Sequence, residues 1–283
     1  MDVDLDFAIK GNSGCRVEMD WLDGECVVRK STTDVNYIQR LRKQIQIQRQ
    51  FFSDAEGSVF HAPKIISESL DSVSYEACME YVPYSDFIDF FQYSDISQIR
   101  SCIDAIVDFI RSNVSKDFFR CNEFVSEKLE QVFSTVQPEV LDSDFKKIQC
   151  RIKDYVSSRE VLLPGGRTHG DLTFSNVMFG LFSKKICLID FLDSYIESPY
   201  MDFVKLRQDS QFKWSLLKVG KDYDKVRVIQ VLDWIDQYLE VNFPMDKELY
   251  GILQAVNMLR ILPYSKSMDE VEFIKKSILR LEF

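Results

Sequence analysis

The sequence predicts an α+β protein with a small sheet-forming lobe over residues 1–82 and a larger, mainly helical lobe over residues 83–283. Two patterns predict this division. In the first part of the chain, short runs of alternating apolar and polar residues are separated by turn residues, which is typical of strands. From Ser85 onward, apolar residues recur at intervals of three and four, which is typical of core-facing helices. A chain of 283 residues is long enough for two lobes with a substantial core.

Charge and composition restrict the classes of partner. The formal net charge is −10, and a nucleic acid or an anionic membrane surface would repel such a chain. No apolar run approaches the roughly 20 residues that cross a bilayer. The seven cysteines form no metal-type pairs, and nothing at the N-terminus resembles a signal peptide. We therefore expect reduced thiols, a cytoplasmic protein and no membrane partner, and the oligomeric state stays open.

The elements of the first lobe follow from alternation and turn residues. Strands are expected at residues 6–10, 15–21, 25–31, 62–66 and 74–81, with a helix at residues 37–52. Asp23-Gly24 is a strong two-residue hairpin signal. Gly11, Ser13 and Gly14 lie in the loop before the second strand, where backbone amides can approach phosphates. Taken alone, this spacing is a weak signal and favours an ordinary hairpin turn over a phosphate-binding loop.

A short stretch of the second lobe concentrates the chemistry. It contains His169, Asp171, Asn176 and Asp190. A carboxylate that orients a hydroxyl, together with an amide and a second carboxylate that hold magnesium, is the set that metal-assisted phosphoryl transfer needs. Apolar runs after Asn176 and before Asp190 predict two paired strands. Folded as a hairpin, these strands would bring Asn176 and Asp190 to the same end, close enough to share a cation.

These residues also carry a resemblance. His169-Gly170-Asp171-x4-Asn176, followed by Ile189-Asp190-Phe191, resembles the catalytic and metal-binding motifs of the aminoglycoside phosphotransferase and choline kinase family, which is related to the protein kinases. The resemblance implies a two-lobed protein-kinase-like fold with ATP in the cleft between the lobes. It implies ATP- and Mg²⁺-dependent transfer of the γ-phosphoryl group to a hydroxyl of a small metabolite, such as an amino alcohol, a sugar or an aminoglycoside.

The resemblance also assigns roles to individual residues. Asp171 is implied to be the catalytic base, and Asn176 and Asp190 are implied to bind magnesium. His169 belongs to the same catalytic loop, which we expect it to fix by hydrogen bonding. Asp202 matches a family aspartate that braces this loop from below.

The nucleotide-binding residues are expected in the first lobe. Lys30, at the end of the third strand, matches the lysine that reaches the phosphates, and Arg29 is its rival because one residue of register exchanges them. The backbone of Glu80 and Val82 matches the hinge that hydrogen-bonds adenine. Gly11, Ser13 and Gly14 correspond to the glycine loop over the phosphates.

One departure from the family pattern concerns the first helix. Relatives place a glutamate there to pair with the strand lysine, but this chain has no acid between Asp34 and Asp54. Gln44 is nearest the expected position and can hydrogen-bond Lys30 without neutralising it. The departure keeps open a different function, that of a non-catalytic nucleotide-binding pseudokinase or sensor.

Two further enzyme classes fit the sequence less well. The segment between Phe191 and Pro199 is too short for the regulated activation loop of a protein kinase. A metal-dependent phosphohydrolase would share the acidic cluster but has no use for the hinge and the glycine loop.

A third group of acidic residues lies late in the chain. Asp233, Asp236 and Glu240 are spaced along one face of a predicted helix. That face is either a solvated surface or an attractor for a cationic acceptor.

Overall fold

The computed structural model describes residues 8–9, 15–54, 58–243 and 245–283. The chain forms two compact units, one made of Met1–Ser94 with Ser175–Asp193 and the other of Asp95–Phe174 with Ser194–Phe283. The predicted α+β fold, with a small antiparallel sheet and a larger helical part, is confirmed. The units do not divide at residue 82, because residues 83–94 and 175–193 belong to the first. The functional division into 1–82 and 83–283 stays a prediction.

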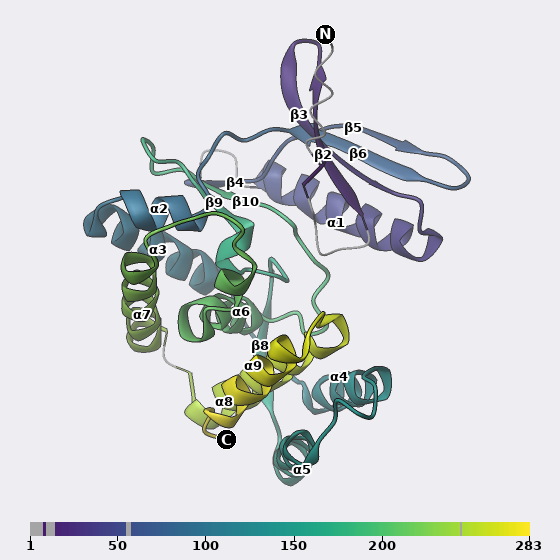
Figure 1. Ribbon diagram of the computed structural model, residues 1–283, viewed down its shortest axis with the longest axis vertical. Coiled ribbons are helices and arrows are strands. Elements are labelled where there is room, and N and C mark those ends of the chain that lie inside the picture. Colours follow the sequence, from purple (N-terminus) through teal and green to yellow (C-terminus); the bar gives the residue numbers. More distant parts are fainter. Residues whose placement is uncertain (1–7, 10–14, 55–57, 244) are drawn as a thin grey trace. The chain divides into compact units, whose positions relative to one another are not determined.

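An antiparallel sheet of five strands dominates the first unit (Figure 1). Its order is β1-β2-β3-β6-β5, and the strands are β1 (Ala8–Ile9), β2 (Arg16–Leu22), β3 (Glu25–Thr32), β5 (Ile65–Leu70) and β6 (Tyr75–Glu80). Asp23 and Gly24 join β2 to β3 with φ of 52° and 85°. Positive φ at both central residues matches the twist of the paired strands, so the predicted two-residue hairpin is confirmed.

Helix α1 (Val35–Asp54) covers one face of this sheet. The apolar core between them consists of Tyr37, Ile38, Leu41, Ile45, Tyr75, Ala77 and Met79. Val28 of β3 packs against this core. Because alternate residues of a strand share a face, Lys30 lies on the α1 side of the sheet and Arg29 on the opposite side.

A second, three-stranded sheet completes the first unit. Its order is β4 (Phe60–His61), β10 (Ile186–Leu188) and β9 (Val177–Phe179), and β9 and β10 pair antiparallel as the sequence predicted. Helix α2 (Phe87–Tyr93) packs beside β9, where the rings of Phe90 and Phe179 stack with centroids 4.2 Å apart. The hairpin that carries the predicted metal ligands is thereby fixed to segments more than eighty residues earlier in the sequence.

The second unit is mainly helical. Its helices are α3 (Ile96–Ser112), α4 (Asn122–Thr135), α5 (Ser143–Ser158), α6 (Pro199–Phe212), α7 (Lys225–Asn242), α8 (Lys247–Leu259) and α9 (Met268–Leu279). Helix α6 is buried over almost its whole length and lies between α7, α8 and α3. Ser198 caps its N-terminus and Pro199 occupies its first turn, as expected of proline. Within the described residues, no helix combines the length and apolarity needed to cross a membrane.

One expectation for this region was wrong. The pattern between Ser85 and Pro164 predicted helices alone, whereas β7 (Val114–Arg120) and β8 (Leu162–Gly166) form an antiparallel pair. β8 contains Pro164, which suits a strand that pairs on one side only because proline donates no ladder hydrogen bond. These two strands lack the long alternation of apolar and polar residues by which strands are recognised in a sequence. β8 matters because it leads directly into the His169 loop.

We predict that Gly166→Ala destabilises the protein by at least ~2 kcal/mol. Gly166 has a φ of +154°, and a Cβ there would lie 2.0 Å from the carbonyl oxygen of Asn113 and 2.9 Å from Pro199 Cγ. Gly220→Ala is the matched control, because nothing lies within 4 Å of its Cβ position. Urea unfolding followed by circular dichroism compares the two variants. Equal midpoints would show that the crowding at Gly166 relaxes without cost.

Candidate active site

The predicted magnesium ligands lie at one end of the β9–β10 hairpin. Asn176 immediately precedes β9, and Leu188 of β10 pairs with Val177. The Ile189 N–H then donates to the Asn176 carbonyl oxygen at 3.1 Å, which joins the two strand ends. Asp190 follows at once, so the structure places Asn176 and Asp190 at the same end of the hairpin. Their side chains offer an amide oxygen and a carboxylate, which are hard donors of the kind that Mg²⁺ prefers.

Asp190 is accessible although it directly follows the buried strand β10. Its side chain is 50% exposed, and its φ of 60° places it in the left-handed region, which aspartate enters more readily than most residues. Such conformations concentrate at functional sites, where the surrounding structure over-determines them. At this turn the Asp190 carboxylate is accessible, and it forms an ion pair with Lys30.

The structure distinguishes Lys30 from Arg29. The Lys30 side chain is only 11% exposed. Burial lowers its pKa, but the neighbouring Asp190 carboxylate raises it further, so the net pKa lies above the ordinary value. Arg29 is bound instead by Asp20 and Glu76, each at 2.6 Å, on the opposite side of the sheet. Of the two basic residues, Lys30 is therefore the one that faces the predicted metal ligands.

Gln44 does not replace the glutamate of the family pattern. It is buried on α1, yet its side-chain nitrogen has no hydrogen-bond partner among the described residues. The polar partner that Lys30 has in this structure is Asp190. A buried amide nitrogen without a partner is costly. Gln48, one turn further along α1, is also buried, but its amide donates to the Pro63 carbonyl at 2.8 Å.

Of the other residues predicted to contact the nucleotide, the structure describes Glu80 and Val82. Gly11, Ser13 and Gly14 lie outside the described residues. Glu80 ends β6, and its backbone N–H donates to the Lys64 carbonyl at 2.9 Å. The carbonyl of Val82 accepts from the Tyr84 N–H at 2.8 Å. The roles of these residues toward a nucleotide stay predictions.

The catalytic-loop motif lies in the second unit, and Asp202 holds it. The Asp202 carboxylate accepts the backbone N–H groups of His169 at 2.6 Å and Gly170 at 2.9 Å. Burial raises the pKa of Asp202 to about 7, against the lowering effect of these two donors. Gly170 has a φ of 82°, a conformation that suits glycine at this bend. The expectation that Asp202 braces the loop is confirmed.

His169 is part of the loop's internal bonding. It is 1% exposed, and its Nδ1 accepts the backbone N–H of Asp171 at 3.2 Å. This bond fixes the start of the segment that carries the predicted base. The arrangement agrees with the expectation that His169 holds the loop by hydrogen bonding.

Asp171 forms an ion pair that the sequence did not predict. Lys205 of α6 donates to Asp171 Oδ1 at 2.8 Å, and the two side chains are 10% and 26% exposed. Burial raises the pKa of Asp171, but the Lys205 charge and hydrogen bond lower it, helped by His169 and Arg260, and the net pKa lies below the ordinary value. Asp171 is therefore held ionised, as a proton acceptor must be.

A second aspartate of α6 supports the end of the loop. Asp209 accepts the backbone N–H groups of Phe174 at 2.8 Å and Ser215 at 3.0 Å. Burial raises its pKa to about 6. Sequence reasoning missed both Lys205 and Asp209. The available signal was their spacing from Asp202, since residues three and seven positions along a helix lie on one face.

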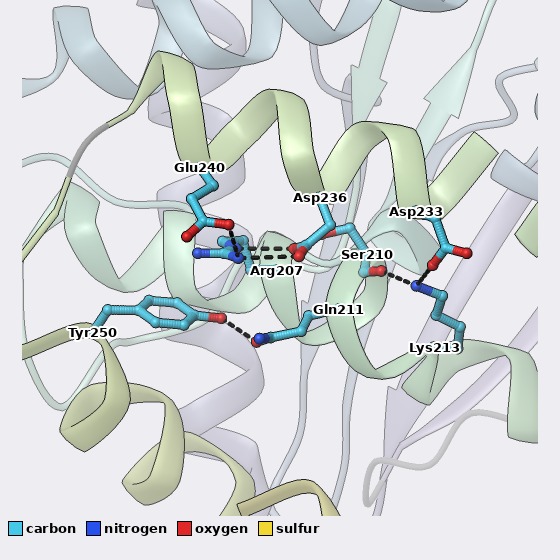
Figure 2. A network of polar contacts seen from close by, with 8 residues as sticks. All are labelled: Arg207, Ser210, Gln211, Lys213, Asp233, Asp236, Glu240 and Tyr250. Atoms are coloured by element: carbon cyan, nitrogen blue, oxygen red, sulfur yellow. Dashed lines mark hydrogen bonds and ion pairs between the residues drawn. The ribbon is translucent and has the colours of Figure 1, made fainter. Parts of the chain in front are cut away.

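The acidic residues of α7 form ion pairs within the second unit (Figure 2). Arg207, which is 7% exposed, binds Asp236 at 2.9 Å and Glu240 at 3.6 Å. Its guanidinium also lies 4.3 Å from the centre of the Tyr250 ring. Asp233 pairs with Lys213 at 2.5 Å. Asp236 and Glu240 border a cavity of about 230 Å³ between α6, α7, α8 and the chain end. Two basic side chains offset most of the negative charge of these three acids, which weakens this face as an attractor for a cationic acceptor.

The comparison with known families now decides the classification. The family described as the phosphotransferase enzyme family (APH) matches residues 9–226. The chain belongs to this family. The match spans both the β3 lysine and the catalytic loop, so the family suggested by the His169–Asp190 motifs is confirmed. Among curated proteins, no relative matches the chain.

Solved structures show the same fold at low sequence identity. An aminoglycoside-3′-phosphotransferase of type VIII aligns with a TM-score of 0.56 and 13% identity, covering 90% of this chain and 92% of that one. The aminoglycoside phosphotransferase APH(3″)-Id of Streptomyces rimosus, solved with ADP and streptomycin, aligns with a TM-score of 0.51 and 15% identity, covering 91% and 94%. A choline/ethanolamine kinase family protein from Mesorhizobium loti aligns with a TM-score of 0.50 and 13% identity, covering 93% and 86%.

We predict that Lys205→Met moves the acid limb of the pH–activity profile to higher pH. Lys205 lowers the pKa of Asp171. Without that charge the Asp171 carboxylate stays protonated up to a higher pH, and a protonated carboxylate cannot accept a proton. Lys205→Arg retains the charge and is the control. The profile of kcat/KM for ATP turnover measures the shift, and an unmoved acid limb in Lys205→Met would contradict the assignment.

Proposed function

We propose that this phosphotransferase is an ATP- and Mg²⁺-dependent small-molecule kinase that transfers the γ-phosphoryl group to a hydroxyl. The observation that carries the proposal is the ionised Asp171, paired with Lys205 on a loop that Asp202 anchors. An anchored, ionised carboxylate suits the orientation and deprotonation of a hydroxyl. The solved relatives include enzymes named for aminoglycosides and for choline or ethanolamine, and one was determined with ADP.

Lys30, Asn176 and Asp190 supply the polar groups for the nucleotide in the first unit. Lys30 would steady the phosphates, and its present partner Asp190 is half exposed and accessible. Asn176 and Asp190 would hold magnesium, which usually binds one or two carboxylates together with substrate phosphates. Bound magnesium would supply charge neutralisation between the phosphates. The backbone of Glu80 and Val82, and the loop of Gly11, Ser13 and Gly14, are proposed contacts for the rest of the nucleotide.

Asp171 acts on the acceptor in this proposal. In phosphoryl transfer, positioning and electrostatic stabilisation carry most of the rate, so the base mainly orients the hydroxyl and takes its proton as the bond forms. His169 and Asp202 fix the backbone that leads into Asp171 and are assigned no proton transfer. Lys205 keeps Asp171 ionised.

A second candidate is a sensor that binds nucleotide without turnover. Gln44 supports it, because this buried amide stands where relatives place the acid that orients the strand lysine. The ionised Asp171 supports the kinase, since a protein that only binds nucleotide has no use for an activated base. Magnesium-dependent nucleotide binding measured beside ADP production across a panel of hydroxyl acceptors separates the two functions.

We predict that Asp171→Asn keeps nucleotide affinity and lowers kcat by at least ~10²-fold, the usual size of general-base assistance. The amide retains the shape of the side chain but cannot accept the proton. Asp154→Asn, on the exposed face of α5, is the control. Calorimetry gives the affinity, and coupled ADP release gives kcat. Near-normal turnover in Asp171→Asn would remove Asp171 from the mechanism.

We predict that Asp190→Ala abolishes magnesium-dependent nucleotide binding. The change removes the carboxylate proposed to bind the ion, together with the ion pair to Lys30. Asp193→Ala is the matched control, because Asp193 is a similarly exposed carboxylate that pairs with Lys43 at 2.6 Å. Titration of the nucleotide with and without magnesium measures the effect. Unchanged affinity in Asp190→Ala would show that Asp190 is not a ligand.

A further inference from the structure

The second unit contains a cavity beside a buried arginine. The cavity has a volume of about 230 Å³ and lies between α6, α7, α8 and residues 280–282. Arg207 of α6 borders it, and the Arg207 side chain is only 7% exposed. Figure 2 shows Arg207 between Glu240 and the ring of Tyr250, which border the same cavity. A guanidinium carries five N–H donors, so the donors that Arg207 leaves unused decide what the cavity can bind.

Arg207 uses only one edge of its guanidinium. Its Nε and Nη2 donate to the two carboxylate oxygens of Asp236 at 2.9 and 3.0 Å. Its Nη1 has no hydrogen bond to any of the described residues. Glu240 lies 3.6 Å from Nη2, which is too long for a hydrogen bond, and its side chain is 54% exposed. The edge formed by Nη1 and Nη2 is therefore available to a second carboxylate, which it can bind through two parallel hydrogen bonds.

Two further cations border the cavity. They are Lys247, at the start of α8, and Arg280, directly after α9. Both are exposed, and neither forms an ion pair with a carboxylate in the described part of the chain. They attract an anion toward the cavity, whereas Glu240 and Glu282 at the same cavity oppose a second negative charge. A singly charged carboxylate is therefore favoured over a doubly charged phosphate ester.

The walls beside Arg207 are apolar. Phe243 and Met245 border the cavity, and the ring of Phe243 stacks on that of Phe203 with centroids 4.4 Å apart. The Tyr250 ring lies 4.3 Å from the Arg207 guanidinium and holds its plane. Ligand cavities of this kind combine apolar walls with a few polar groups that fix orientation. The matching ligand carries an apolar body next to its carboxylate.

The cavity and the catalytic loop use different faces of α6. Asp202, Lys205 and Asp209 hold the loop, and their spacing of three and four residues places them on one face of the helix. Arg207 is two residues from Lys205, which corresponds to roughly 200° of rotation around the helix axis. A ligand on Arg207 is thus separated from Asp171 by the helix itself and is not the phosphoryl acceptor.

We propose that this cavity is a second ligand site, which binds a small carboxylate with an apolar body. The carboxylate takes the free edge of Arg207 in place of the long contact to Glu240, and the body lies against Phe243, Met245 and Tyr250. The site does not depend on the proposed function, because no residue assigned to the catalytic loop, the metal or the nucleotide borders it. Its ligand binds the folded protein and so stabilises it by mass action.

A series of compounds that share one ring tests the ligand class. We would titrate benzoate, phenyl phosphate, benzamide and benzylamine, with acetate as the carboxylate that lacks the body, into the wild-type protein in the absence of nucleotide. Ligand-observed NMR gives the affinities in about 0.15 M salt, where distant surface charges are largely screened. Benzoate should bind at least ~10-fold more tightly than each of the other four, because it alone has both a single negative charge for the Arg207 edge and an apolar body.

Variants then locate the contact. Glu240→Gln removes the acid that opposes the ligand at this edge, so it should raise benzoate affinity by at least ~3-fold. Asp233→Asn is the matched control, because it makes the same change of charge on the same helix at a half-exposed acid that does not border the cavity, and it should leave the affinity unchanged. Arg207→Lys keeps a charge beside Asp236 but removes the planar edge, and it should lower benzoate affinity by at least ~10-fold.

The opposite results would overturn the proposal. It fails if benzoate does not bind the wild-type protein, if any of the other four compounds binds as tightly, or if Glu240→Gln and Asp233→Asn change the affinity equally. Thermal unfolding checks that each variant is folded. If Arg207→Lys does not fold, the wild-type series and the exposed position 240 still decide.

Discussion

The catalytic loop depends on one buried carboxylate. Asp202, in the first turn of α6, accepts the backbone N–H groups of His169 and Gly170 and so fixes the loop before it reaches Asp171. Three residues along the helix, Lys205 binds Asp171, and a further turn on, Asp209 binds the N–H of Phe174. Three buried polar residues of a single helix thus hold the start of the loop, bind its carboxylate and hold its end.

The first unit brings together polar side chains from distant parts of the chain. The pair of three-residue strands β9 and β10 would be marginal alone. It is held by pairing with β4 and by the stacking of Phe90 on Phe179. With the hairpin fixed, Asp190 leaves β10 in a left-handed turn and pairs with Lys30 of the neighbouring sheet. An amide, a carboxylate and an ammonium are thereby positioned within one unit.

The acidic residues of α7 are bound by basic residues of the same unit. They are paired by Arg207 and Lys213, so the fold itself uses the face that first suggested a cationic substrate (Figure 2).

The sequence alone determined the features that depend on residues close together in the chain. The Asp23-Gly24 turn, the family motifs and the placement of Asn176 beside Asp190 all follow from short-range spacing, because turn geometry and strand alternation are local. Tertiary structure decided what depends on contacts across the chain: the β7–β8 pair, the orientation of Lys30 rather than Arg29 toward Asp190, and the Lys205–Asp171 ion pair. Lysine at position 205 looks like an ordinary helix residue until packing removes water from it and brings it to a carboxylate thirty-four positions away.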